Sequence, residues 1–148
     1  MGTPAFIASM RQTLRTTLLL TAALLMGFAA VVNAVISVPH LRADMAEINV
    51  RSTLLGAVSL GLYFSTFAMF GFALVVLVAA VQASRGATPA RPLLAIIATI
   101  YVAFGVGAFF MWSGSAHTLG YVLMGVLIGL ATALPSSTDS SPAHGVLP

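Results

Sequence analysis

The sequence has no cysteine and only three acidic residues among its 148 positions, and all six of its Lys and Arg residues are arginine. The lack of cysteine excludes disulfides, iron–sulfur clusters and thiolate zinc sites. With so few acids and no lysine, there is little material for acid–base or covalent catalysis. The sequence also matches no phosphate-binding loop, dinucleotide-binding fingerprint or nucleophile elbow. These absences favour a non-enzymatic protein, and we expect no cofactor.

Charge is scarce overall. Only 6% of the residues are charged, whereas about 25% is usual in a soluble domain. Hydrophobic residues make up 59% of the chain, which is more than a protein of this size can hide from water. A lipid bilayer removes that conflict and is therefore the first partner we predict. The arginines are spread along the chain, so nucleic-acid binding is not expected.

Stretches without charge divide the chain into membrane spans. Three such stretches, 16–41, 52–84 and 92–138, carry no Asp, Glu, Lys or Arg. A span needs about 20 apolar residues, so the third stretch has room for two spans. We predict an all-α integral membrane protein, a four-helix antiparallel bundle. Its spans are expected at about 17–38, 54–82, 93–112 and 118–134.

The prolines and the polar end of the chain set the limits of this bundle. Pro39 is predicted to end the first span, because proline cannot continue the hydrogen-bond ladder of a helix. Residues 1–135 are predicted to form a single membrane domain. The following segment, 136–148, is rich in Ser and Pro, and we expect a disordered polar tail.

The distribution of arginine predicts the orientation of the bundle. Arg11, Arg15, Arg85 and Arg91 fall on one side of the predicted spans, which the positive-inside rule assigns to the cytoplasm. Both termini are therefore expected in the cytoplasm, and the lysine-free composition suggests a bacterial inner membrane. In an alternative interpretation, the first apolar stretch is a signal peptide cleaved near Ala34, which would leave three spans.

The most polar segment, 39–52, lies between the first two spans. On a helix, His40, Asp44, Glu47 and Arg51 would form one polar stripe, because they are spaced at i, i+4, i+7 and i+11. This pattern predicts a short amphipathic helix at the membrane surface. Its simplest role is a solvated face with i, i+4 pairs of compatible charge.

The same segment permits a metal site. An imidazole and two carboxylates on one helical face can bind a divalent ion or relay protons. His117 lies in the other loop on that side of the membrane, so His40, Asp44, Glu47 and His117 are candidate ligands for zinc or a similar ion. This arrangement would make the protein a metal-dependent membrane enzyme with a site at the outer surface.

Small residues recur at four-residue spacing on three of the predicted spans. They are Gly61 and Ser65 in the second span, Ala103 and Gly107 in the third, and Gly125, Gly129 and Ala133 in the fourth. Such flat faces let helix backbones approach closely. They either pack inside the bundle or dock a second copy or another subunit.

A few other side chains in the spans could carry function. Tyr63, Phe67 and Tyr101, with Asn33, could surround a cavity for a small lipophilic molecule. The simpler expectation for Asn33 is a hydrogen bond between helices. The spans contain no Asp, Glu, Lys, Arg or His, which argues against a proton-driven pump.

Three hypotheses follow from these patterns. The first is a structural or accessory subunit that associates with itself or with a larger membrane complex. The second is a protein that binds or transports a small lipophilic molecule within the bundle. The third is the metal-dependent enzyme.

Overall fold

The computed structural model describes residues 4–111 and 116–135, and this part of the chain is helical with short connections. The elements are α1 (Pro4–Val32), the π-helical η1 (Asn33–Ser37), α2 (Val38–Glu47), α3 (Ser52–Ser84), α4 (Arg91–Met111), the 3-10 turn η2 (Ala116–Thr118) and α5 (Leu119–Ala133). The expected spans at 54–82, 93–112 and 118–134 overlap α3, α4 and α5. The predicted disordered tail, 136–148, and residue 112 lie outside the described residues.

The first helix does not end at Pro39. Helical structure continues through α1, η1 and α2 as one helical segment, Ala5–Glu47. In η1 the chain widens into a π turn, in which the Val38 amide donates to the carbonyl of Asn33, five residues earlier. A π turn just before a proline shifts the register of the helical hydrogen bonds. The helix can therefore accommodate the ring of the proline and the amide hydrogen that it lacks. The helix therefore does not end at Pro39, contrary to the prediction, and the polar segment extends the first helix.

The predicted surface helix over 39–52 is also shorter than expected. It ends at Glu47, and Asn49 adopts a positive φ of 54°. The Asn49 amide donates to Ala46 (3.2 Å) and the Val50 amide to Met45 (3.2 Å). This is a C-terminal cap in which asparagine takes the left-handed position that glycine usually fills. The chain then turns back and α3 begins at Ser52.

Glycine makes the corresponding stop at the end of α3. Gly86 has a φ of 76°, and the Ala87 amide donates to the carbonyl of Gln82 at 2.9 Å. Because glycine enters the left-handed region at no steric cost, the helix stops there and the chain can lead to α4.

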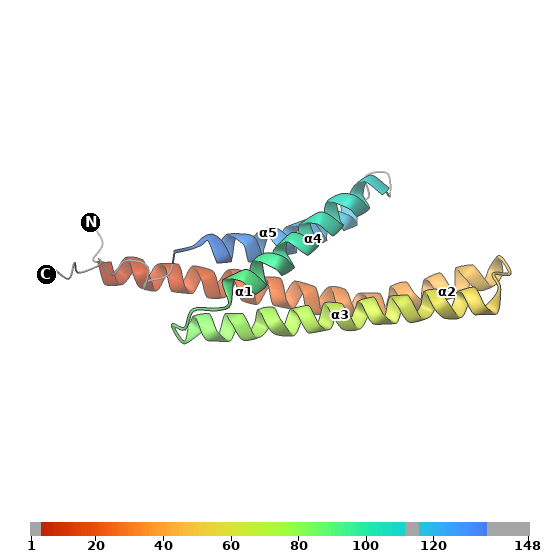
Figure 1. The fold of residues 1–148 in the computed structure, drawn as a ribbon, viewed down its shortest axis with the longest axis horizontal. Coiled ribbons are helices and arrows are strands. Elements are labelled where there is room, and N and C mark those ends of the chain that lie inside the picture. Colours follow the sequence, from red (N-terminus) through yellow and green to blue (C-terminus); the bar gives the residue numbers. More distant parts are fainter. Residues whose placement is uncertain (1–3, 112–115, 136–148) are drawn as a thin grey trace, which may run out of the picture.

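The helices pair as two hairpins (Figure 1). The continuous α1–α2 helix lies against α3, and α4 lies against α5. In Figure 1 the hairpins meet near the end where α1 begins, and they diverge toward the opposite end. We call the meeting end the near end and the opposite end, which carries the α2–α3 turn, the far end.

The core that all four long helices share lies toward the near end. Its buried side chains come from α1, α3, α4 and α5 and include Leu19, Ala22, Met26, Val76, Ala80, Leu94, Ile97, Met124 and Ile128. At this end alanines on α3 face the core, which lets the helices approach closely. Toward the far end the two hairpins diverge (Figure 1). The shared core thus joins the hairpins at one end and leaves them apart at the other.

Within the described residues, three helical segments are long and apolar enough to cross a membrane, namely Ala5–Glu47, Ser52–Ser84 and Arg91–Met111. Most side chains of these segments are exposed, as expected where lipid replaces water. At 1.5 Å per residue, α3 is about 50 Å long, and a hydrocarbon core is about 30 Å thick. α5 has 15 residues and is about 22 Å long. The structure is thus compatible with an integral membrane protein containing at least three spanning helices.

Candidate functional site

The polar stripe of the sequence lies on α2, at the far end of the molecule. His40, Asp44 and Glu47 are all exposed on this helix. Within the described part of the chain, no three His, Asp or Glu side chains are grouped closely enough to hold a metal ion. The backbone of His117 lies in η2, and its side chain is not among those described. Among the described side chains, His40, Asp44 and Glu47 therefore form no group that could hold a metal ion, and the place of the His117 side chain lies outside the described residues.

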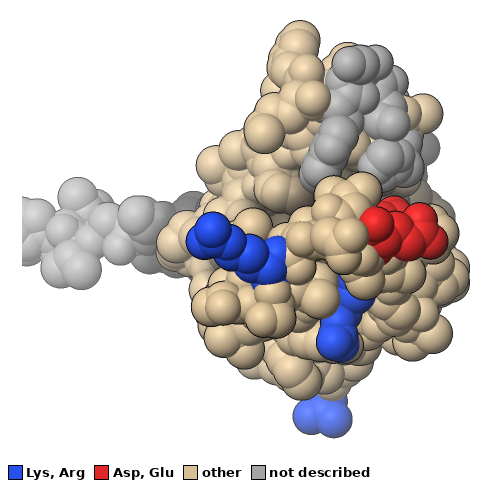
Figure 2. All heavy atoms as spheres, turned by 90° about the vertical axis from the view of Figure 1, so that its right-hand side faces the viewer, with Lys and Arg blue, Asp and Glu red and all other residues tan. Residues whose placement is uncertain are grey.

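The fourth member of the stripe, Arg51, does not share the helix. The cap at Asn49 separates Glu47 from Arg51, so their i, i+4 relation is lost. Figure 2 shows acidic atoms as one patch at the far end and arginine atoms apart from it. Among the described residues, neither Asp44 nor Glu47 forms an ion pair, which leaves this end as a solvated polar surface.

A buried polar pair joins the first helix to α3. Asn33, at the start of η1, donates from Nδ2 to Oγ1 of Thr66 at 2.7 Å. The Thr66 hydroxyl in turn donates to the carbonyl of Leu62 at 3.0 Å. Thr66 is only 4% exposed, so the pair satisfies polar atoms that lipid could not. The interhelical hydrogen bond expected for Asn33 is therefore present, and its partner is Thr66.

The aromatic residues proposed to line a cavity do not surround one space. Tyr63 and Phe67 are exposed on α3. Tyr101 is buried, with its ring centroid 6.2 Å from that of Phe72 and 6.3 Å from that of Tyr121. Because the rings of Tyr63 and Phe67 are exposed and that of Tyr101 is packed inside, these residues do not line one common binding site.

The near end is held by side chains that donate to helix ends. Arg15 on α1 donates from Nε to the carbonyl of Ala131 at 3.2 Å and from Nη2 to the carbonyl of Leu134. Arg91, the first residue of α4, donates from Nη2 to the same Leu134 carbonyl at 3.2 Å. The last carbonyls of a helix have no partner within it, and they attract cations. These arginines thus join α1, α4 and the C-terminal end of α5.

A neutral side chain makes an equivalent contact at the end of α3. The Gln12 amide on α1 donates from Nε2 to the carbonyl of Ser84 at 3.1 Å. In the sequence, Arg15 and Arg91 were only indicators of orientation, and Gln12 had no predicted role. The available signal was where these polar residues lie: shortly before an apolar run or at its start. Helix ends gather there, because spans leave the membrane at these points.

The small residues divide into a packed group and an outward group. Gly125 packs against α4, where an added Cβ would lie 2.7 Å from the Ala98 carbonyl oxygen and 2.9 Å from the Val102 nitrogen. A second close approach lies at Gly105 on α4, which was not among the small residues singled out from the sequence. A Cβ there would lie 2.8 Å from the Val122 nitrogen. Only glycine permits this close approach of α4 and α5.

The other small residues lie outside this contact. An added Cβ would meet nothing within 4 Å at Gly61, Gly107 or Gly129. Ser65, Ala103 and Ala133 are exposed. Open surface at Gly61 and Ser65 leaves a flat strip on α3, which we call the α3 strip.

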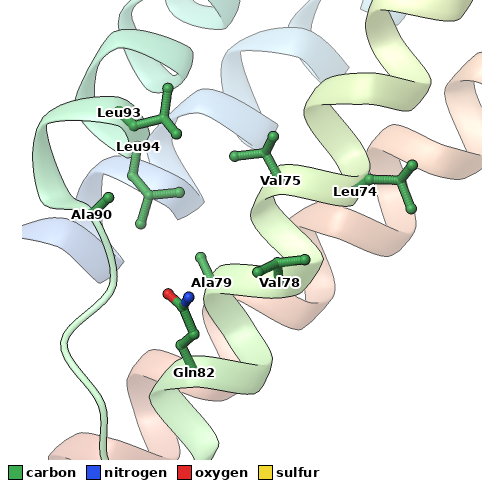
Figure 3. Close-up of a pocket in the computed structure, with 8 residues that line it drawn as sticks. All are labelled: Leu74, Val75, Val78, Ala79, Gln82, Ala90, Leu93 and Leu94. Carbon is green, nitrogen blue, oxygen red and sulfur yellow. The ribbon is translucent and has the colours of Figure 1, made fainter.

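An apolar groove lies between α3 and α4 close to the near end (Figure 3). Its volume is about 350 Å³, and its lining residues are Leu74, Val75, Val78, Ala79, Gln82, Ala90, Leu93 and Leu94. Gln82 is the polar member and lies at the end of the groove nearest the connection to α4. The groove is thus apolar along its walls, with one polar side chain, Gln82, at its end.

No protein-family model, curated protein or solved structure matches this chain. The described acids lie on the surface of α2, and the buried polar pair holds two helices together. The arrangement is suited to contacts between helices and with lipid.

Proposed function

We propose that this chain is a small structural or accessory membrane subunit that associates with a second copy of itself or with a larger membrane complex. The observation that carries the proposal is the outward-facing α3 strip of Gly61 and Ser65. A Cβ added at Gly61 would meet no atom within 4 Å, so this surface is flat and has no partner within the described chain. In a bilayer, such small-residue faces are the usual places where helix backbones meet.

The surroundings of the strip support the same proposal. Large apolar side chains flank it, with Leu60 72%, Phe64 74% and Phe67 73% exposed. Toward the far end the α4–α5 hairpin diverges from this half of α3 (Figure 1). Lipid or another protein must therefore contact the strip, and flat surfaces between large side chains favour a packed helix.

We further propose that α5 is a fourth span and that both termini lie in the cytoplasm of a bacterial cell. Support comes from Arg15 and Arg91, which contact the C-terminal end of α5. Arg15 lies where the apolar part of α1 begins, so α5 ends on the side of the membrane where α1 enters. A green fluorescent protein fused after Pro148 is expected to be fluorescent. A fluorescent-protein fusion that is dark, together with an active alkaline phosphatase fusion at the same position, would place the C-terminus outside and overturn this orientation.

The association is tested by native mass spectrometry of the chain released gently from its own membrane. We expect the mass of a second copy or of additional subunits. Gly61→Leu would fill the α3 strip and is expected to remove that extra mass. Gly71→Leu is a matched control, because Gly71 is also exposed on α3 with nothing within 4 Å of an added Cβ.

Two outcomes would overturn the association proposal. One is a wild-type chain that leaves the membrane with no protein partner under conditions that preserve known membrane complexes. The other is a partner that Gly61→Leu and Gly71→Leu retain equally, which would place the contact away from the α3 strip.

A further inference from the structure

The groove between α3 and α4 is open to the surroundings of the protein. Leu74, Val78 and Leu93 on its walls are 61%, 56% and 45% exposed, respectively. In a bilayer these side chains face lipid, so an acyl chain can enter the groove from the side. We propose that the groove holds one acyl chain of an anionic phospholipid, whose phosphate lies beside Arg85.

The shape and lining of the groove suit a hydrocarbon chain. Its volume of about 350 Å³ falls within the range of about 300–1,000 Å³ usual for small-molecule pockets. Seven of its eight lining residues are apolar, the exception being Gln82. A hydrocarbon chain bound along the apolar walls would therefore bury no polar side chain other than Gln82 at the end of the groove.

The charges at the near end favour an anionic headgroup. Gln82 lies at the end of the groove, and Arg85 follows one turn later at the end of α3. Arg85 is exposed, and its side chain has no hydrogen-bond or ion-pair partner among the described residues. On the other wall, Arg91 follows directly after Ala90 of the groove.

No described acid lies beside Arg85. Asp44 and Glu47, the acids in the part of the chain that the structure describes, both lie on α2 at the far end. An arginine near the membrane surface attracts anionic lipid. The polar end of the groove is therefore complementary to a negative headgroup at the depth where an acyl chain begins.

The proposal is tested on the full-length chain, purified in detergent and stripped of lipid. Equal amounts of phosphatidylglycerol and phosphatidylcholine with identical acyl chains are added, and bound lipid is counted by native mass spectrometry. We expect the wild-type chain to retain phosphatidylglycerol preferentially. The readout is lipid mass on each chain, so it is independent of the protein mass that tests the association proposal.

Two substitutions separate the headgroup from the acyl chain. Arg85→Gln is expected to lower the preference for phosphatidylglycerol about fivefold, whereas Arg51→Gln, an exposed arginine at the far end, is the control. Val78→Trp would fill the groove and reduce binding of both lipids, whereas Leu60→Trp changes an exposed residue of α3 outside the groove. All four positions are exposed, so the fold should tolerate each change.

The proposal is overturned if the wild-type chain binds the two lipids equally. It is also overturned if Arg85→Gln behaves like Arg51→Gln, or if Val78→Trp behaves like Leu60→Trp.

Discussion

Arg15 of α1 and Arg91 of α4 donate hydrogen bonds to the same acceptor, the main-chain carbonyl oxygen of Leu134 just after α5. Neither arginine has a described acid nearby, because Asp44 and Glu47 lie on α2 at the far end. The carbonyls at the negative end of the α5 dipole have no acceptor role within the helix and accept these hydrogen bonds instead. Charges that would be costly inside a membrane protein therefore hold its helices together at one end.

The Arg15 contact gives the first prediction. Arg15→Gln removes the guanidinium donors to Ala131 and Leu134 and should lower the free energy of unfolding by about 1–3 kcal/mol. Unfolding is measured by circular dichroism during SDS titration in mixed micelles. Arg11→Gln, at an exposed position on the same helix, should change it by less than about 0.5 kcal/mol. Equal midpoints for the two variants would show that the contact does not stabilise the fold.

The close approach of α4 and α5 gives the second prediction. Gly125→Ala places a Cβ 2.7 Å from the Ala98 carbonyl oxygen, so the helices must separate, with an expected loss of about 1–3 kcal/mol. Gly129→Ala adds the same methyl group one turn later, where nothing lies within 4 Å. The control should be neutral or more stable by up to about 1 kcal/mol, because alanine favours helix more than glycine does. The two variants are compared by SDS titration. A Gly125→Ala variant as stable as Gly129→Ala would contradict the close packing of α5 against α4.

The Asn33–Thr66 pair gives the third prediction. Removing either side chain loses the same hydrogen bond, so the effects of Asn33→Leu and Thr66→Val should not add. A double-mutant cycle should return a coupling energy of about 0.6 kcal/mol, the average for hydrogen bonds between membrane helices. The cycle requires the unfolding free energies of the wild type, the two single variants and the double variant. Strictly additive losses would mean that the pair does not couple the first helix to α3.

The cap at Asn49 gives the fourth prediction. Asn49→Gly should preserve or slightly increase stability, because glycine adopts a positive φ without strain. Asn49→Ala should cost about 1–2 kcal/mol, since alanine in the left-handed region brings its Cβ too close to the backbone. Thermal unfolding in detergent micelles measures both. Equal stability of Asn49→Ala and Asn49→Gly would show that the turn does not need the left-handed conformation.

Helix positions were largely predictable from the pattern of charge and hydrophobicity, but their ends were less so. The helix at 52–84 follows from a long apolar run with charges beyond both ends, and Gly86 supplies a familiar stop. The break at Asn49 was missed, because the spacing of the polar residues was interpreted as one helix over 39–52. Pro39 was given too much weight, since the π turn at 33–37 accommodates it.

The candidate site was less predictable than the helices. Spacing on one helix placed His40, Asp44 and Glu47 on a common stripe, but no described group of three can hold a metal. Similarly, the four-residue spacing of small residues did not distinguish Gly125, which packs against α4, from Gly107, which faces outward. Spacing determines which residues share a face, and it says nothing about which face another helix will cover.

Composition and charge spacing were enough to predict a set of apolar helices long enough to cross a membrane, because the hydrogen bonds within a helix and the length of an apolar run are local properties of the sequence. The pairing of the two hairpins, their divergence, the meeting of Arg15 and Arg91 at Leu134, and the groove beside Gln82 required the packed structure. These features join residues far apart in the chain, and in lipid the hydrophobic effect does not select among apolar faces. Close packing and a few hydrogen bonds make that selection, and they depend on the shapes of both partners.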